Sequence, residues 1–299
     1  MLPARRILFV HAHPDDETLT TGGAIARYAA APGTVCAVVT CSLGEEGEVI
    51  PPELRELAPD RGDQLGGYRV HELAAALGAL GGPEHRYLGG LGRWRDSGME
   101  HGEGTRALTP AVLHPRALAA PGAFDEQLGQ LLGVVDELRP QVVVSYADDG
   151  GYGHPDHVRA HELTTAAAAA RPDVVARVFH AVRSRSALDA GLAGIRDLPG
   201  MPFRVPGPDE LPSAPDAVVT TRLDVPEHRA ARVAAMRAHA TQIAVWEHAD
   251  GARGAAGAAG TVAFAMSNGV AQPLIDVEEY AMASGAGPTP TDDLFAGLD

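Results

Sequence analysis

Two clusters of histidine and carboxylate side chains stand out in this sequence. The first is HAHPDDE at residues 11–17, and the second is YGHPDH at 152–157. A catalytic zinc takes three nitrogen, oxygen or sulfur ligands from the protein and leaves a fourth position open. His13 and Asp16, three residues apart, can turn toward one point at the start of a helix, and His157 is the best-placed third ligand. The two clusters therefore predict one catalytic metal site.

The other residues of the clusters suggest acid–base chemistry. Asp15 stands beside a ligand and can take a proton from water that the metal activates, since a metal lowers the pKa of bound water to about 7. His154 and Tyr152 are expected to face a substrate carbonyl, where an imidazolium or a phenol stabilises a developing oxyanion. We expect Asp156 to keep His154 charged.

Structural roles would also explain these residue types. Asp15 and Asp16 could simply cap the helix that follows them, a common role for aspartate. His11 is better explained as a structural histidine at a strand end than as a ligand, and residues 154–157 could form a surface loop. The presence of both clusters, each soon after an apolar run, favours the metal site.

Those apolar runs are the elements that must position the clusters. Residues 7–10 (ILFV) and 142–146 (VVVSY) have the length and β-branched content of buried parallel strands. In an open α/β sheet, ligands bind beyond the carboxyl ends of the strands. Two clusters at two such ends can therefore meet in one crevice.

The first half of the chain alternates between strand and helix patterns. A third strand is predicted at 35–41, and helices are predicted at 21–28 with its flanks, 64–80, 124–139 and 156–171. This alternation predicts an α/β fold, with a Rossmann-like, doubly wound and mainly parallel sheet.

The second half is less regular and predicts a smaller C-terminal portion. We expect strands at 178–182 and 218–223, one long helix at 226–247 with a solvated histidine- and arginine-bearing face, and a Gly/Ala-rich loop at 251–260. The predicted organisation is a catalytic domain at 1–175, an α/β portion at 176–284 that completes the site, and a flexible tail at 285–299. Long irregular stretches at 44–63, 89–121 and 189–215 are typical of binding loops.

Composition excludes several classes of function. The 299 residues carry 24 basic and 39 acidic side chains, a formal charge of −15, which argues against a nucleic-acid partner. All basic residues are arginine, so mechanisms that need a lysine Schiff base or a P-loop lysine are excluded. Hydrophobic residues make up 45% of the chain, enough for a sizeable core.

The two cysteines, Cys36 and Cys41, lie in one predicted strand. At ~3.3 Å per residue they stand roughly 16 Å apart on opposite faces, too far for a disulfide. Reduced, buried thiols fit a cytoplasmic protein. The sequence opens directly into a strand, and the absence of an 18-residue apolar run predicts no membrane span.

The two clusters together resemble the LmbE/PIG-L family of zinc-dependent N-acetylglucosaminyl deacetylases. Loop motifs are similar to those of the mycothiol-pathway branch, whose members remove acetate from an N-acetylglucosaminyl-inositol, a pseudodisaccharide. These motifs lie at 40–49 (TCSLGEEGEV), 64–69 (QLGGYR), 88–99 (LGGLGRWRDSGM), 150–154 (GGYGH) and 264–268 (FAMSN). The resemblance covers most of the chain.

The resemblance also implies a role for each matching residue. One zinc ion, with ferrous iron as the alternative, would bind His13, Asp16 and His157. Asp15 would be the general base, His154 the oxyanion-side histidine and Tyr152 a mobile tyrosine facing the carbonyl. The remaining implied contacts are with the substrate: Arg69 and Asp96 with the sugar, and Glu48 with the inositol.

Three other functions compete with this one. The related mycothiol S-conjugate amidases share the metal motifs but typically carry a lysine shortly after the first, where this chain has TLTTG at 18–22; weak overlapping amidase activity is still expected. A non-catalytic sugar- or nucleotide-binding module is the second, although 13–23 lacks Gly-x-Gly-x-x-Gly. The third is a non-heme iron oxygenase, whose iron also binds two histidines and one carboxylate.

Overall fold

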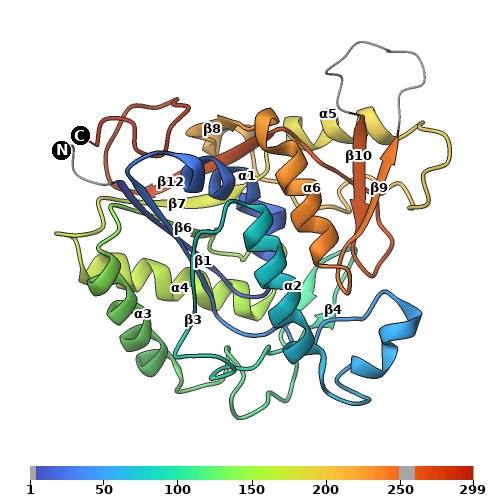
Figure 1. The fold of residues 1–299 in the computed structure, drawn as a ribbon, viewed down its shortest axis with the longest axis horizontal. Helices are drawn as coiled ribbons and strands as arrows, with labels where there is room; N and C mark the ends of the chain where they lie inside the picture. The colour runs from blue at the N-terminus through green and yellow to red at the C-terminus, as the bar shows by residue number, and fades with distance from the viewer. Residues whose placement is uncertain (1–4, 249–259, 299) are drawn as a thin grey trace.

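A seven-stranded sheet forms the centre of the molecule (Figure 1). The computed structural model describes residues 5–248 and 260–298. The strand order is β3-β2-β1-β6-β7-β12-β8. The strands are β1 (Arg5–His11), β2 (Thr34–Thr40), β3 (Glu84–Tyr87), β6 (Val142–Tyr146), β7 (Arg177–Val182), β8 (Thr221–Asp224) and β12 (Val277–Ser284). The first five strands in this order are parallel, and β12 runs antiparallel to both of its neighbours. The predicted α/β fold with a mainly parallel sheet is confirmed.

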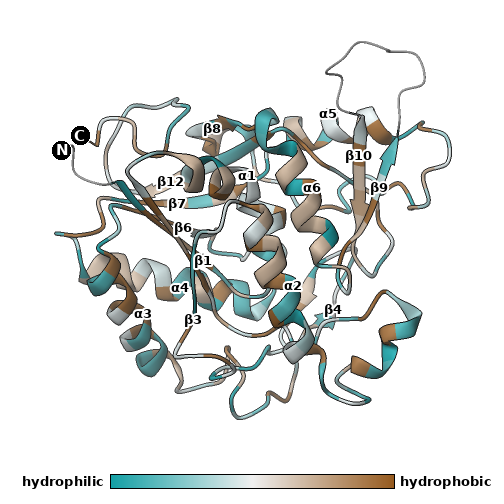
Figure 2. Cartoon of the chain, in the orientation of Figure 1, coloured by the Kyte–Doolittle hydropathy of each residue, from teal (hydrophilic) through white to brown (hydrophobic). Residues whose placement is uncertain are grey.

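Helices cover both faces of this sheet because the strand residues alternate between two cores. The helices are α1 (Asp16–Ala30), α2 (Leu65–Ala79), α3 (Phe124–Leu138), α4 (Pro155–Ala170), α5 (Arg185–Ile195) and α6 (Arg229–Ala238). In β1, Ile7 and Phe9 pack with α1, α2 and α6, whereas Leu8 and Val10 pack with α3 and α4. Figure 2 shows the apolar character of the central strands. Burial on both faces explains why these strands read as continuous apolar runs.

Smaller elements surround the sheet on the side of its carboxyl ends. A hairpin pairs β4 (Glu100–His101) with β5 (Ala107–Leu108), and an antiparallel sheet joins β9 (Ala244–His248), β10 (Thr261–Ala265) and β11 (Gln272–Pro273). Three short 3₁₀ helices lie at Pro52–Leu57, Asp216–Val218 and Pro226–His228. Among the described residues, none of the helices combines the length and the hydropathy needed to cross a membrane.

The single helix predicted at 226–247 is wrong. A 3₁₀ turn precedes α6, which ends at Ala238, and the chain then turns into β9, whose Val245 and Trp246 pair with β10. The carboxylate of Glu72 from α2 accepts hydrogen bonds from both the backbone N–H (2.8 Å) and the hydroxyl (2.6 Å) of Thr241. These bonds to another helix replace the ones that would have continued α6.

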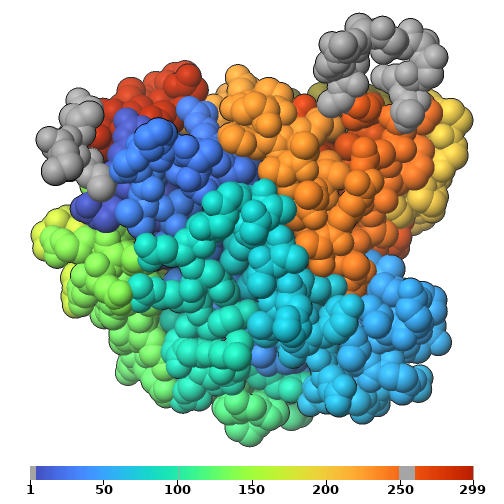
Figure 3. Space-filling model, viewed as in Figure 1, coloured from blue at the N-terminus to red at the C-terminus, as the bar shows by residue number. Residues whose placement is uncertain are grey.

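The C-terminal segment also differs from its prediction. Part of the predicted flexible tail packs on the fold: Thr291 pairs with Thr221 of β8, and residues 293–295 pack against the start of the chain (Figure 3). Leu294 and Phe295 are fully buried, and the Tyr28 hydroxyl donates to Asp293 at 2.8 Å. The stretch at 189–215, predicted to be irregular, begins within α5. Apolar residues too sparse to predict an element were sufficient to anchor the chain end.

Cys36 in β2 and Cys41 directly after it lie on opposite faces of the sheet, as predicted. Cys36 is buried in the core beneath α1 and α2, and Cys41 lies in the core beneath α3 and α4. Both thiols are free. Burial raises the pKa of each thiol to about 12, so neither is a reactive nucleophile at neutral pH.

Candidate active site

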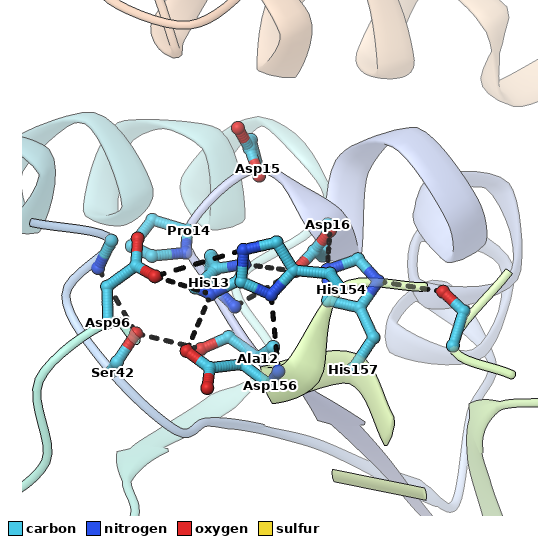
Figure 4. A network of polar contacts seen from close by, with 12 residues as sticks. Ala12, His13, Pro14, Asp15, Asp16, Ser42, Asp96, His154, Asp156 and His157 are labelled. Atoms are coloured by element: carbon cyan, nitrogen blue, oxygen red, sulfur yellow. Dashed lines mark hydrogen bonds and ion pairs between the residues drawn. The ribbon is translucent and has the colours of Figure 1, made fainter. Parts of the chain in front are cut away.

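The two histidine clusters meet at the carboxyl ends of β1 and β6, which are neighbours in the sheet (Figure 4). The first cluster forms the turn from β1 into α1, and the second forms the turn from β6 into α4. A cavity of about 830 Å³ opens at this edge of the sheet. Nine of the ten residues predicted for the site line this cavity. The tenth, Asp156, lies behind His13.

Asp16 lies between two histidines in an arrangement that could hold a metal. Its Oδ2 is 3.4 Å from His13 Nδ1, and its Oδ1 is 3.3 Å from His157 Nε2. With bonds of about 2.0–2.1 Å, the ligand atoms of a tetrahedral zinc stand about 3.3 Å apart. His157 points its Nδ1 at the carbonyl of Gly150 (3.0 Å), while its buried Nε2 makes no hydrogen bond within the described part of the chain. That orphaned nitrogen and the two spacings fit a divalent metal.

Tyr146, at the end of β6, fixes the orientation of this group. Its hydroxyl donates to Asp16 Oδ2 at 2.7 Å and accepts from the backbone N–H of Ala12 at 2.8 Å, and its ring stacks on His157 with centroids 4.1 Å apart. Burial alone would raise the pKa of Asp16, but His157 and His13 hold it well below its ordinary value. The sequence analysis treated Tyr146 only as a strand residue. Its position at the end of a strand, where ligands bind, could have identified it as a site residue.

The predicted pairing of Asp156 with the His154 ring is wrong. The Asp156 carboxylate lies 3.1 Å from His13 Nε2 and is held by the backbone N–H (2.9 Å) and hydroxyl of Ser97. Asp96 Oδ1 also approaches His13 Nε2, at 3.4 Å. The cause is α4, whose first turn directs Asp156 toward β1. A carboxylate behind a ligating imidazole fixes its orientation and raises its basicity.

His154 caps α4 and faces the cavity together with Tyr152. Its Nδ1 accepts the backbone N–H of Asp156 at 3.2 Å, and its Nε2 lies 4.0 Å from Asp96 Oδ1. Burial, together with His13 and His157, lowers the pKa of His154 to about 2. The ring centroids of Tyr152 and His154 are 6.0 Å apart. Burial raises the pKa of the Tyr152 phenol above its ordinary value. A neutral imidazole and a protonated phenol therefore stand side by side in this structure.

Asp15 occupies an unusual backbone conformation, with φ 110° and ψ −32°. It stands at the N-cap position of α1 but makes no side-chain capping bond within the described structure, so the capping alternative is wrong for this residue. Its Oδ2 instead accepts from Arg69 Nη2 at 3.0 Å. Burial raises the pKa of Asp15 to about 6 against the opposing effect of Arg69. The carboxylate is therefore ionised at neutral pH and close to the range in which proton transfer is efficient.

The three residues assigned to substrate come from separate elements. Arg69 projects from α2, Asp96 from the loop after β3, and Glu48 from the loop after β2. The Arg69 guanidinium donates to the carbonyls of Pro14 and Gly44 as well as to Asp15. The backbone carbonyl of Glu48 accepts from Gln242, a cavity residue that sequence reasoning missed.

His239 is the largest departure from the sequence-based expectation. It follows α6 and was assigned to a solvated face, yet it is completely buried, 2.8 Å from Glu17 of the first cluster. His239 lies three residues after Met236 and four before Ile243, so helical spacing placed it among the packing residues of the predicted helix, and that signal was missed. The packing of α6 against α1 brings it to the site.

Comparison with known proteins gives a family. The family model described as "PIG-L: GlcNAc-PI de-N-acetylase" matches residues 8–168, from β1 through most of α4. The chain belongs to the PIG-L family. The matched segment of this PIG-L protein contains both histidine clusters, Arg69 and Asp96.

Curated relatives extend the similarity to the C-terminal part. A 1D-myo-inositol 2-acetamido-2-deoxy-alpha-D-glucopyranoside deacetylase of Actinosynnema mirum is 56% identical over 293 residues, covering 98% of this chain and 97% of the relative. A protein of the same description from Saccharopolyspora erythraea is 55% identical, covering 98% and 94%. A solved deacetylase–bog complex from the teicoplanin biosynthesis pathway is 26% identical with a TM-score of 0.50, covering 79% of this chain and 84% of that chain.

Proposed function

We propose that this PIG-L protein hydrolyses the acetamide of 1D-myo-inositol 2-acetamido-2-deoxy-α-D-glucopyranoside, releasing acetate and the free amine in mycothiol biosynthesis. The relatives described above support the substrate, since their identity of 55–56% extends over nearly the whole chain. The single observation that carries the reaction is the grouping of His13, Asp16 and His157 beside the buried carboxylate of Asp15.

In this proposal, His13, Asp16 and His157 hold one zinc ion, with ferrous iron as the alternative. When bound, the ion would act as a Lewis acid and lower the pKa of water at the site. Tyr146 and Asp156 orient the ligands from behind through their contacts with Asp16 and His13. The proposed ligand set contains no thiolate, because the side chain of Cys41 is buried in the core beneath the site.

Asp15 acts as the general base. Its carboxylate lines the cavity, and burial brings its pKa close to neutrality, so it can accept a proton from water and return one to the leaving amine. His154 and Tyr152 donate hydrogen bonds toward the oxygen of the acetamide as negative charge develops on it. Tyr152 is suited to donate because its phenol stays protonated.

Sugar recognition is assigned to Arg69 and Asp96, and recognition of the inositol to Glu48. A polyol offers hydroxyl groups as both donors and acceptors, and a site built to bond them rejects analogues that lack them. All three residues line the same cavity as the proposed metal ligands. Asp96 lies within 3.4 Å of His13 Nε2, so it links substrate recognition to a metal ligand.

The test is acetate release from the pseudodisaccharide by chelated protein and by protein reloaded with zinc or ferrous iron. We expect activity only after reloading, and a kcat/KM for the inositol conjugate well above that for plain N-acetylglucosamine. Equal values would indicate a general acetamido-sugar deacetylase. A strong preference for a mycothiol S-conjugate would favour an amidase, and substrate binding without acetate release would favour a binding module.

A further inference from the structure

The backbone of Asp15 is held in a region that residues with side chains rarely adopt. Its φ of 110° persists only where the surroundings fix it. The carbonyl of Asp15 accepts the N–H groups of Thr18 and Leu19 in the first turn of α1, both at 3.0 Å. Its own N–H donates to Oε2 of Glu17 at 2.9 Å. The Glu17 carboxylate therefore anchors the amide end of this strained residue.

Glu17 has no access to solvent, so its carboxylate depends on partners within the fold. Its Oε1 accepts from the Thr18 hydroxyl at 2.6 Å and lies 2.8 Å from Nε2 of His239. Both side chains of the Glu17–His239 pair are 0% exposed. A carboxylate buried this deeply is strongly destabilised when its partner is removed.

The fold places His239 independently of the first cluster. It lies 222 residues beyond Glu17 in the sequence, at the end of α6. Its carbonyl accepts the N–H groups of Gln242 at 3.0 Å and of Ile243 at 2.9 Å, and α6 packs against both α1 and α2. These contacts hold the His239 imidazole beside Glu17.

We propose that His239 is a positioning residue for Asp15 and acts through Glu17. His239 fixes the Glu17 carboxylate, Glu17 fixes the Asp15 amide, and the strained backbone then aims the Asp15 side chain into the cavity. Arg69 anchors the other end of Asp15, at its carboxylate. The inference rests on the proposed function, in which Asp15 is the general base.

The experiment compares His239→Leu, His239→Gln and Thr241→Val. Leucine removes the N–H donor, and glutamine supplies a neutral one. Thr241→Val is the matched control, because it removes the bonds of this hydroxyl to Glu72 and from Gln242 in the same turn and leaves the Asp15 contacts intact. We expect His239→Leu to lower kcat by about 10- to 100-fold, since small misplacements of a catalytic group cost up to about 100-fold.

Three further readouts separate positioning from general damage. In His239→Leu, KM should stay within about twofold and bound metal at one equivalent, while His239→Gln should recover most of kcat. The Asp15 amide should exchange its hydrogen faster in His239→Leu, whereas Thr241→Val should match the wild type in kcat and in this exchange. A folded His239→Leu protein with wild-type kcat, or a parallel loss of metal, would overturn the proposal.

A double-mutant cycle with Glu17→Gln tests whether His239 acts on Asp15 through Glu17. The Glu17→Gln side chain retains an acceptor for the Asp15 N–H but carries no charge, so adding His239→Leu should then lower kcat by less than about threefold. An equal loss in both backgrounds would show that His239 acts elsewhere. If His239→Leu does not fold, a loss of more than about threefold on adding it to Glu17→Gln would still overturn the proposal. If the wild type released no acetate, the proposed function would fail, whereas the exchange of the Asp15 amide would still test the contact.

Discussion

Removing the hydroxyl of Tyr146 should weaken metal binding without changing the ligands themselves. Tyr146→Phe deletes the 2.7 Å bond to Asp16 Oδ2 and leaves the ring stacked on His157. A hydrogen bond to a buried charged group contributes about 1.5–3 kcal/mol. A tenfold change in affinity corresponds to about 1.4 kcal/mol. If most of the bond energy is lost from metal binding, the metal affinity falls by about 10- to 100-fold, the usual effect of removing a residue that holds a ligand in place.

The same substitution should also reduce the stability of the fold. The N–H of Ala12, buried at the end of β1, loses its acceptor, and an unsatisfied buried donor costs about 1–3 kcal/mol. Tyr28→Phe is the matched control: the Tyr28 hydroxyl donates to Asp293 at 2.8 Å and accepts from the N–H of Leu294 at 2.9 Å, with no contact to a metal ligand. Both variants should lose similar stability in the absence of metal.

The assay is a competition titration of zinc with a chromophoric chelator, alongside denaturant unfolding of the metal-free proteins. Tyr146→Phe should show a raised zinc Kd and a lowered free energy of unfolding, and Tyr28→Phe only the second change. An unchanged zinc Kd in Tyr146→Phe would refute the reasoning, because the hydroxyl would then contribute nothing to ligand orientation. Equal losses of zinc affinity in both variants would refute it as well.

Other substitutions test the remaining assignments. His13→Ala should remove most bound metal and activity together, and metal analysis showing a full equivalent would disprove the ligand assignment. Asp15→Asn, which tolerates the positive φ better than alanine, should keep its metal but lose about 10²–10⁴-fold in kcat; a near-normal kcat would move the base elsewhere. Asp96→Ala should cost about ten- to more than a hundredfold in kcat/KM, from about 1.5–3 kcal/mol for a charged hydrogen bond to a hydroxyl. Because Asp96 also approaches His13, its metal content should be measured in parallel, and a kcat/KM loss matched by metal loss would remove it from substrate recognition.

Local pattern was sufficient to predict the scaffold and the location of the site. Apolar runs at 7–10 and 142–146 predicted β1 and β6, because a strand buried on both faces leaves a continuous apolar signature in the sequence. The rule that parallel strands present their carboxyl ends to ligands then brought His13 and His157 to one edge. These inferences need only short stretches of chain, and the structure confirmed the two predicted strands.

Tertiary structure alone decided which side chains contact one another within the site. The bonds from Tyr146 to Asp16, from Asp156 to His13 and from His239 to Glu17 join residues 130, 143 and 222 positions apart. The direction of Asp156 depends on how α4 begins, and the contact of His239 with Glu17 depends on the packing of α6 against α1. Such contacts form when separate elements pack, so their energies are absent from any local window. The sequence by itself therefore predicted the central strands and the candidate site residues, while packing between distant elements set the orientation of those side chains.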